Sequence, residues 1–253
     1  MAESFSLSLT NSLNEVSGAL PKEFNTTRFV QNAVALLNDN EQLQKYAKEN
    51  GTGQIKAGMM KAAYLGLDFM SKEAYLIPYG KQLNFMVDYR GNVKLAKKYS
   101  IRPIKDIYAK LVREGDSFEE KIVNGEPSID FNPKPFNDGK IIGAFAVCLY
   151  KDGGMIYDTM SLEDLENTRK SSKMANGATW NKFTGEMYKK TVLHRLCKHI
   201  ELDFDSPEQY KYFGEDMEVA TTEERVANEI EENANSVEFP NAEVIDVEDS
   251  SET

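Results

Sequence analysis

The chain has few of the residues from which metal and redox sites are built. Its 253 residues include only two cysteines, Cys148 and Cys197, and two histidines, His194 and His199. There is no CxxC pair, and each cysteine directly follows an apolar residue, so we expect both to be buried structural thiols. A zinc site needs a closely spaced set of cysteine and histidine ligands, which this chain lacks. We therefore predict neither a metal nor a cofactor.

Motifs that mark several enzyme classes are also absent. The sequence contains no GxxxxGK[ST], GxGxxG, HExxH or GxSxG. ATP-driven strand exchange, dinucleotide chemistry, zinc proteolysis and serine hydrolysis therefore lack their usual residues. A magnesium-dependent nuclease would need convergent carboxylates, and we interpret the scattered acids of this chain as surface residues. These acids are Asp68, Glu73, Asp88 and Asp130. We predict that the protein is not an enzyme.

Long apolar runs are missing as well. No segment approaches the roughly 20 apolar residues of a transmembrane helix. Residues 1–10 have neither the basic start nor the apolar centre of a secretory signal. The expected location is therefore the cytoplasm, without a membrane partner.

Charge is distributed unevenly along the chain. The overall net charge is −11, which taken alone argues against nucleic acid as a partner. Residues 201–253, however, hold 18 Asp and Glu but only two basic residues, a net charge of −16. Residues 1–200 hold 28 Lys and Arg against 23 acids, a net charge of +5. The sequence thus combines a basic body with an acidic C-terminal segment.

Hydrophobic periodicity predicts an α+β chain in which helices come first, then strands, then helices. Apolar residues at helical spacing predict one or two helices over 26–48 and others over 54–65, 92–99, 162–170 and 186–200. Alternating residues predict a hairpin over 74–88 and strands over 108–113, 121–123, 141–150 and 155–160. This segregation favours a small antiparallel sheet or meander packed with helices. The expected domains are a flexible N-terminus over 1–25, one domain over 26–213 and a disordered acidic tail over 214–253.

Two segments of the body are strongly basic. Residues 81–113 contain nine Lys and Arg and two Asp, with Tyr89, Tyr99 and Tyr108 interleaved. Residues 169–198 contain eight Lys and Arg and a single acid, Glu186. Cations that meet phosphates, together with rings that stack on bases, are typical of single-strand binding. We predict that both segments line one groove, although solvated lysines around core aromatics would give the same pattern.

The second basic segment contains the strongest predicted helix. On a helical wheel, the basic residues share one arc and the apolar residues share the other, so we expect a buried face and a cationic face. The residues of the basic arc are Lys190, His194, Arg195 and Lys198. Lys189 falls in the apolar arc, where its stem can snorkel or contact a neighbouring subunit. Trp180 lies in the polar loop over 171–184, and two roles stay open for it: stacking on a base or anchoring the loop.

Four segments resemble the RecT family of single-strand DNA annealing proteins. They are AYLGLDF from Ala63, EAYLIPYGKQLNFMVDYRGNVKLAKK from Glu73, GAFAVCLYKDGG from Gly143 and EMYKKTVLHRLCKHI from Glu186. The resemblance as a whole covers roughly residues 25–200, with these segments in a consistent order. The resemblance implies ATP-independent binding of single-stranded DNA and annealing of complementary strands in phage or prophage recombination, inside a bacterial host.

The resemblance also implies partners and site residues. The partners would be single-stranded DNA, annealed duplex, further copies of the chain in a ring or helical filament, a processive exonuclease and a host single-strand binding protein. Together with the charge pattern, it points to fifteen residues for nucleic-acid binding. These are Lys81, Asn84, Tyr89, Arg90, Lys94, Lys97, Lys98, Arg113, Lys170, Lys173, Trp180, Lys189, Lys190, Arg195 and Lys198.

Several interpretations stay open at the level of sequence. The acidic tail is either a solvating end or a regulator that competes with DNA for the groove or contacts replication proteins. The basic segments would also suit a structural oligomer without annealing activity, and the third alternative is a metal-dependent nuclease. Annealing by the purified protein without ATP separates the first function from the other two.

Overall fold

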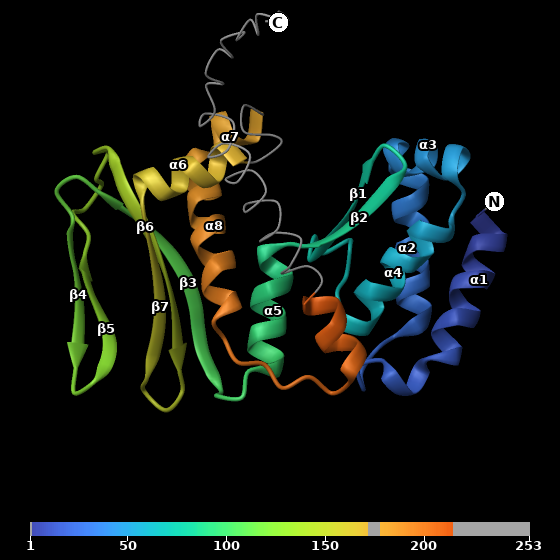
Figure 1. The fold of residues 1–253 in the computed structure, drawn as a ribbon, viewed down its shortest axis with the longest axis horizontal. Coiled ribbons are helices and arrows are strands. Elements are labelled where there is room, and N and C mark those ends of the chain that lie inside the picture. The colour runs from blue at the N-terminus through green and yellow to red at the C-terminus, as the bar shows by residue number, and fades with distance from the viewer. Residues whose placement is uncertain (1, 172–177, 215–253) are drawn as a thin grey trace, which may run out of the picture.

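The computed structural model describes residues 2–171 and 178–214 (Figure 1). Within them, small antiparallel sheets pack with helices, which confirms the predicted α+β class. The predicted acidic tail lies outside the described residues except for Gly214, and so does Lys173. In the described part of the chain, no helix is long and apolar enough to span a membrane.

The N-terminal half is a group of helices around one apolar core. The helices are α1 (Ala2–Glu15), the short 3-10 helix η1 (Ser17–Ala19), α2 (Thr26–Asp39), α3 (Glu41–Asn50) and α4 (Gly53–Leu65). The antiparallel hairpin of β1 (Ala74–Tyr79) and β2 (Gln82–Val87) packs against this group. The predicted helices over 26–48 and 54–65 and the hairpin over 74–88 are thereby confirmed.

The N-terminus differs from the prediction of a flexible segment over 1–25. Helix α1 buries Phe5, Leu9 and Leu13 in the same core as α2 and α4. These three residues are four apart, which places them on one face of a helix. The segment is rich in serine, threonine and asparagine, but the apolar stripe is sufficient to fix it to the domain.

A three-stranded sheet forms the centre of the second half. Its order is β3 (Ile104–Arg113), β6 (Ile141–Tyr150) and β7 (Met155–Ser161), all antiparallel. A separate hairpin, β4 (Ser117–Val123) and β5 (Glu126–Asn132), is inserted between β3 and β6. The sheet is therefore not a simple meander, and β5, which begins at Glu126 and Pro127, was absent from the prediction.

Strand β6 is covered on both faces, and its side chains alternate accordingly. Ala144, Ala146 and Cys148 contact the core beneath α6 (Leu162–Ser171) and α8 (Thr184–Lys198). Phe145 and Val147 point to the opposite face, where Phe145 packs on rings of the β4–β5 hairpin. Since side chains alternate along a strand, small residues face the helices and large ones face the hairpin.

The chain after α8 returns to the N-terminal half. Residues 207–214 are helical, and Gln209 is fully buried there. Its amide nitrogen donates to the carbonyl oxygen of Tyr64 at 2.9 Å and to the hydroxyl of Tyr99 at 3.0 Å. Phe204 packs on Tyr99 with ring centroids 4.9 Å apart. This segment, seen beside α5 in Figure 1, ties the two halves together.

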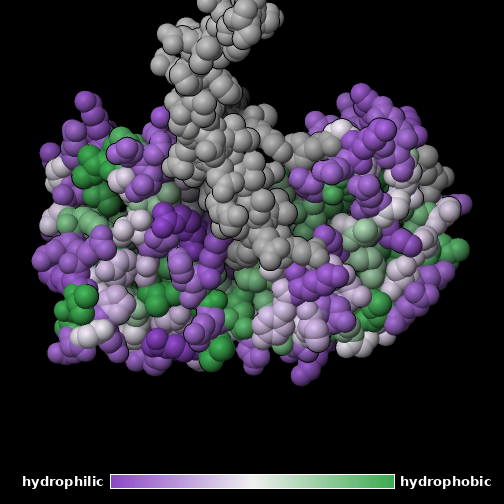
Figure 2. Space-filling view, in the orientation of Figure 1, coloured by the Kyte–Doolittle hydropathy of each residue, from purple (hydrophilic) through white to green (hydrophobic). Residues whose placement is uncertain are grey.

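The exterior is predominantly polar on the face shown in Figure 2, where hydrophobic colour is confined to separate patches. Phe136 is the most exposed large apolar side chain of the described residues, and Ile122 and Val123 lie exposed at the end of β4. Scattered apolar residues of this kind are ordinary on a folded protein.

Candidate nucleic-acid interface

Helices α5 (Tyr89–Tyr99) and α8 lie side by side and bring the two basic segments together (Figure 1). Between them, the side-chain amide of buried Asn92 donates to Nδ1 of His194 at 2.8 Å. Burial, followed by the charges of Lys198 and Lys190, lowers the pKa of His194 to about 4, so the ring is neutral at pH 7. The predicted cationic face of α8 is therefore partly covered by α5.

Asp88, which was expected to be a surface acid, is instead a buried carboxylate that joins these two helices. As the N-cap of α5, it accepts a hydrogen bond through Oδ1 from the backbone N–H of Arg90 at 3.3 Å. Its Oδ2 accepts from Nζ of Lys190 at 2.5 Å. The side chain of Asp88 is 3% exposed and that of Lys190 38% exposed. Lys190 is thus held at the beginning of α5, with its side chain partly exposed.

We expect Asp88→Ala to lower the free energy of unfolding by about 2 kcal/mol. The substitution removes the helix cap and leaves Lys190 without its buried partner, and the exposure of Lys190 keeps the loss below that of a fully buried pair. Chemical denaturation at pH 7 measures the change. Asp88→Asn is the matched control, because an amide still caps α5, and it should lose about half as much. Equal stability of all three proteins would contradict this role.

Tyr89 begins α5 and has two cations beside its ring. The guanidinium carbon of Arg90 lies 5.7 Å from the ring centroid, and Nζ of Lys190 lies 5.6 Å from it. Nε of Arg90 also donates to the Tyr89 hydroxyl at 3.3 Å, and this hydrogen bond raises the pKa of the exposed Arg90. An aromatic ring flanked by positive charges is a combination found where proteins bind single strands.

A cavity of about 390 Å³ opens next to this ring. Its lining is mainly apolar and comes from α5, β3 and α8. The residues that line it are Tyr89, Ala109, Phe183, Glu186, Met187, Lys189, Lys190 and Leu193. Sequence reasoning found Tyr89, Lys189 and Lys190 but missed Phe183 and Met187. Their spacing of four residues around the start of α8 was the signal that could have indicated a shared face.

Two of the other predicted cations of α8, Lys189 and Arg195, have acidic neighbours. Lys189 lies 2.6 Å from Glu186 of the preceding helical turn, and both belong to the cavity lining. Nε of Arg195 lies 3.1 Å from Oδ2 of Asp158 on β7, close enough for an ion pair but not aligned for a hydrogen bond. Lys198, at the end of α8, is half-buried. Lys189 and Lys190 thus line the same cavity as Tyr89, whereas Arg195 pairs with an acidic residue of the sheet.

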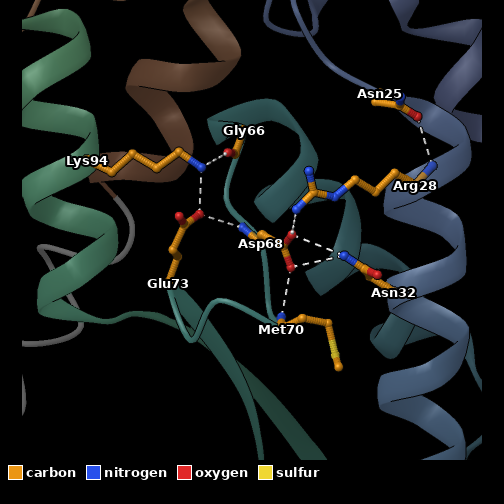
Figure 3. A network of polar contacts seen from close by, with 8 residues as sticks. All are labelled: Asn25, Arg28, Asn32, Gly66, Asp68, Met70, Glu73 and Lys94. Carbon is orange, nitrogen blue, oxygen red and sulfur yellow. Dashed lines mark hydrogen bonds and ion pairs between the residues drawn. The ribbon is translucent and has the colours of Figure 1, made fainter.

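Lys94 belongs to a structural network rather than to the cavity (Figure 3). Its ammonium donates to Glu73 at 2.6 Å and to the carbonyl oxygen of Gly66 at 2.8 Å. The same Glu73 carboxylate accepts from the backbone N–H of Asp68 at 2.8 Å, and Asp68 in turn binds Asn32 of α2. Lys94 of α5 thereby fixes the 66–73 loop, which connects α4 to β1.

We expect Lys94→Met to lower the free energy of unfolding and to leave the salt dependence of DNA binding unchanged. The substitution retains the apolar stem but removes two hydrogen bonds, and because the lysine is 42% exposed the expected loss is only about 1 kcal/mol. Thermal denaturation measures the loss, and titration with an oligonucleotide at several salt concentrations measures the slope. If the slope of log affinity against log salt fell while stability stayed unchanged, Lys94 would be a DNA contact and not a structural residue.

The remaining members of the first segment are dispersed. Lys97 pairs with Asp106 at 3.4 Å, and Nζ of Lys98 lies 4.8 Å from the ring of Tyr99, both near the end of α5. Lys81 and Asn84 lie on the β1–β2 hairpin. Arg113 ends β3 and donates to the carbonyl oxygen of Gly139 at 2.7 Å, so it holds the chain that leads into β6.

Trp180 packs inward. It lies in the short helix α7 (Ala178–Lys182), which replaces part of the predicted polar loop, and its ring is 6% exposed. Its neighbours are the ring of Tyr188 at 6.2 Å and the guanidinium of Arg169 at 5.7 Å. In this conformation the ring anchors α7 and is not available to stack on a base. Lys170 is exposed at the end of α6.

The two thiols are confirmed as buried groups. Burial raises the pKa of Cys197 to about 12 and that of Cys148 to about 11, so neither is a reactive thiolate at pH 7. Among the described residues, no three His, Cys, Asp or Glu side chains lie close enough to hold a metal ion. The features that the described residues bring together at the site are cations, aromatic rings and an apolar cavity.

Comparison with known proteins adds an independent line of argument. The family model described as "RecT family" matches residues 27–236, which is most of the chain. Over 201 residues the chain is 27% identical to Protein RecT of Escherichia coli strain K12, an alignment that covers 76% of this chain and 72% of that protein. The four resembling segments and the extent of this match agree: the chain belongs to the RecT family of DNA-annealing recombination proteins.

Proposed function

We propose that this protein binds single-stranded DNA and anneals complementary strands without ATP, in homologous recombination of the phage type. The observation that carries the proposal is the placement of Tyr89 beside Arg90 and Lys190 at a cavity where the two basic segments meet. Membership of the RecT family supports it from a separate direction. The proposal extends to a basic groove that continues from one protomer to the next in a ring or helical filament.

In this mechanism the protein holds the strand by its phosphates. The cations that contact phosphate oxygens are Arg90, Lys189, Lys190 and Lys198. The buried carboxylate of Asp88 keeps Lys190 in position at the beginning of α5. Most base edges then stay exposed and can sample a second strand. Base pairing supplies the specificity, so no side chain has to read a sequence. Annealed duplex is the product that remains on the same surface.

Annealing of two complementary oligonucleotides in a buffer with EDTA and without nucleotide tests the function directly. We expect the purified protein to accelerate the loss of single strands, and we expect binding to weaken steeply with salt as counterions are no longer released favourably. Binding that barely changes between low and moderate salt would contradict the phosphate-based groove. DNA bound without faster annealing would favour a scaffold, and cleavage that requires a divalent metal would favour a nuclease.

Two kinds of protein partner belong to the same proposal. A processive exonuclease would supply single-stranded ends, and a host single-strand binding protein would occupy the strands before annealing. Both would be encountered in the bacterial cytoplasm.

A further inference from the structure

We infer that the cavity beside Tyr89 binds one nucleobase of the bound strand. This inference rests on the proposed function, because it identifies the part of the DNA that occupies the cavity. Phosphate binding uses the cations of the lining, Lys189 and Lys190, and gives no role to its apolar part. Its volume of about 390 Å³ falls within the range of small-molecule sites, roughly 300–1,000 Å³. A purine or pyrimidine ring with its sugar is a ligand of this size.

The walls of the cavity suit the faces of a base. Tyr89 and Phe183 contribute two aromatic rings, and Ala109, Met187 and Leu193 contribute apolar surface. Phe183 precedes α8 and is 59% exposed, which is unusual for a phenylalanine that packs in its own core. An exposed ring at the entrance of an apolar cavity provides a stacking surface that any base can use.

The charges around the cavity favour a nucleotide over an apolar side chain of a neighbouring subunit. Lys190 has three N–H donors, and the structure gives one of them to Asp88. Lys189 is the next residue of the chain and pairs with Glu186, and the guanidinium carbon of Arg90 lies 5.7 Å from the centroid of the Tyr89 ring. A nucleotide combines an apolar face with a phosphate and satisfies both parts of this surface, whereas an inserted aliphatic or aromatic side chain would satisfy only the apolar part.

One base per cavity has a consequence for annealing. A base that is held against Tyr89 and Phe183 is withdrawn from pairing until the incoming strand competes for it, while its neighbours remain free to pair. The cavity would therefore fix the register of the strand on each protomer and release its base as the duplex forms.

The test compares a thymine oligonucleotide with an abasic strand of the same length, which has the same phosphates but no bases. We expect the full-length wild-type protein to bind the thymine strand on the order of tenfold more tightly, because stacking contributes only there. Phe183→Ala should bring this ratio close to one, and Phe183→Trp should restore it. Phe136→Ala removes an exposed ring from the loop between β5 and β6 and is the matched control, so its ratio should equal that of the wild type.

Each result other than the expected one contradicts a specific part of the proposal. Equal binding of both strands by the wild type would overturn the base site and leave the phosphate-based function intact. Failure to bind either strand would refute the proposed function itself. A wild-type preference that Phe183→Ala retains would place base stacking elsewhere. If Phe183→Ala instead changes the size of the assembly in light scattering without altering the ratio, the cavity receives a neighbouring subunit and the inference is wrong.

Discussion

The triple variant Arg90→Ala, Lys189→Ala and Lys198→Ala should bind single-stranded DNA on the order of 100-fold more weakly than the wild type at about 0.1 M salt. Each lost phosphate contact reduces the slope of log affinity against log salt by about 0.7 for a single strand, so the slope should fall by about 2. Arg90 lies in the first turn of α5, Lys189 lies in the second turn of α8, and Lys198 is the last residue of α8. Lys190 is left intact, because its removal would leave the carboxylate of Asp88 buried without a partner.

The matched control carries the same change in net charge at other places. Lys45→Ala, Lys48→Ala and Lys121→Ala remove three cations from α3 and β4, away from the α5–α8 pair (Figure 1). Fluorescence anisotropy with a labelled oligonucleotide at four salt concentrations measures affinity and slope for both variants. We expect the control to stay within a few-fold of the wild type. Equal losses in the two variants would mean that overall charge, and no particular surface, attracts the DNA.

The sequence predicts the elements of this fold better than it predicts which cations are available. Local periodicity is sufficient to place the helices of the N-terminal half, the β1–β2 hairpin and α8. Pairing depends instead on residues that are distant in the chain. Glu73 is 21 residues from Lys94, and Asp88 is 102 residues from Lys190. Only the folded chain shows that Lys94 holds the 66–73 loop and that Lys190 lies beside Tyr89.

The missed features have physical explanations of the same kind. Strand β5 begins with Glu126 and Pro127, and proline is a poor strand residue unless the strand is an edge, which it is in a two-stranded hairpin. Trp180 was open to two interpretations because an aromatic residue between lysines looks the same in a sequence whether it faces the solvent or the core. The ring of Tyr188 and the guanidinium of Arg169 decide in favour of the core.

The cavity illustrates what composition cannot reveal. Ala109 lies on β3, Tyr89 on α5 and Met187 on α8, and their convergence depends on the packing of three elements. The charge pattern predicted that two basic segments meet, but it contained no information about an apolar space between them. A surface made only of cations would hold phosphates at any register, whereas a cavity adds a fixed point along the strand.

Acidification should destabilise the wild-type protein by about 3 kcal/mol more than it destabilises His194→Gln between pH 7 and pH 4. The pKa of His194 falls from 6.5 to about 4 on folding, mainly because the ring is buried between α5 and α8. Lys198 and Lys190 lower it further, and Asp88 opposes them. Between pH 6.5 and pH 4, His194 therefore binds a proton in the unfolded chain but not in the folded chain. The stability that the neutral ring provides is complete above pH 6.5 and is lost as the pH falls toward 4.

Glutamine isolates this effect, because its amide can still accept a hydrogen bond from Asn92 but does not titrate. Carboxylates that titrate in the same range are common to both proteins, so their contribution cancels in the difference. Denaturation with urea at pH 7, 6, 5 and 4 gives the free energy of unfolding of each protein. The difference between the two curves should be constant above pH 6.5 and should change steadily below it. Parallel curves over the whole range would show that the pKa of His194 is the same in the folded and unfolded chains, which would contradict a neutral ring held by burial between α5 and α8.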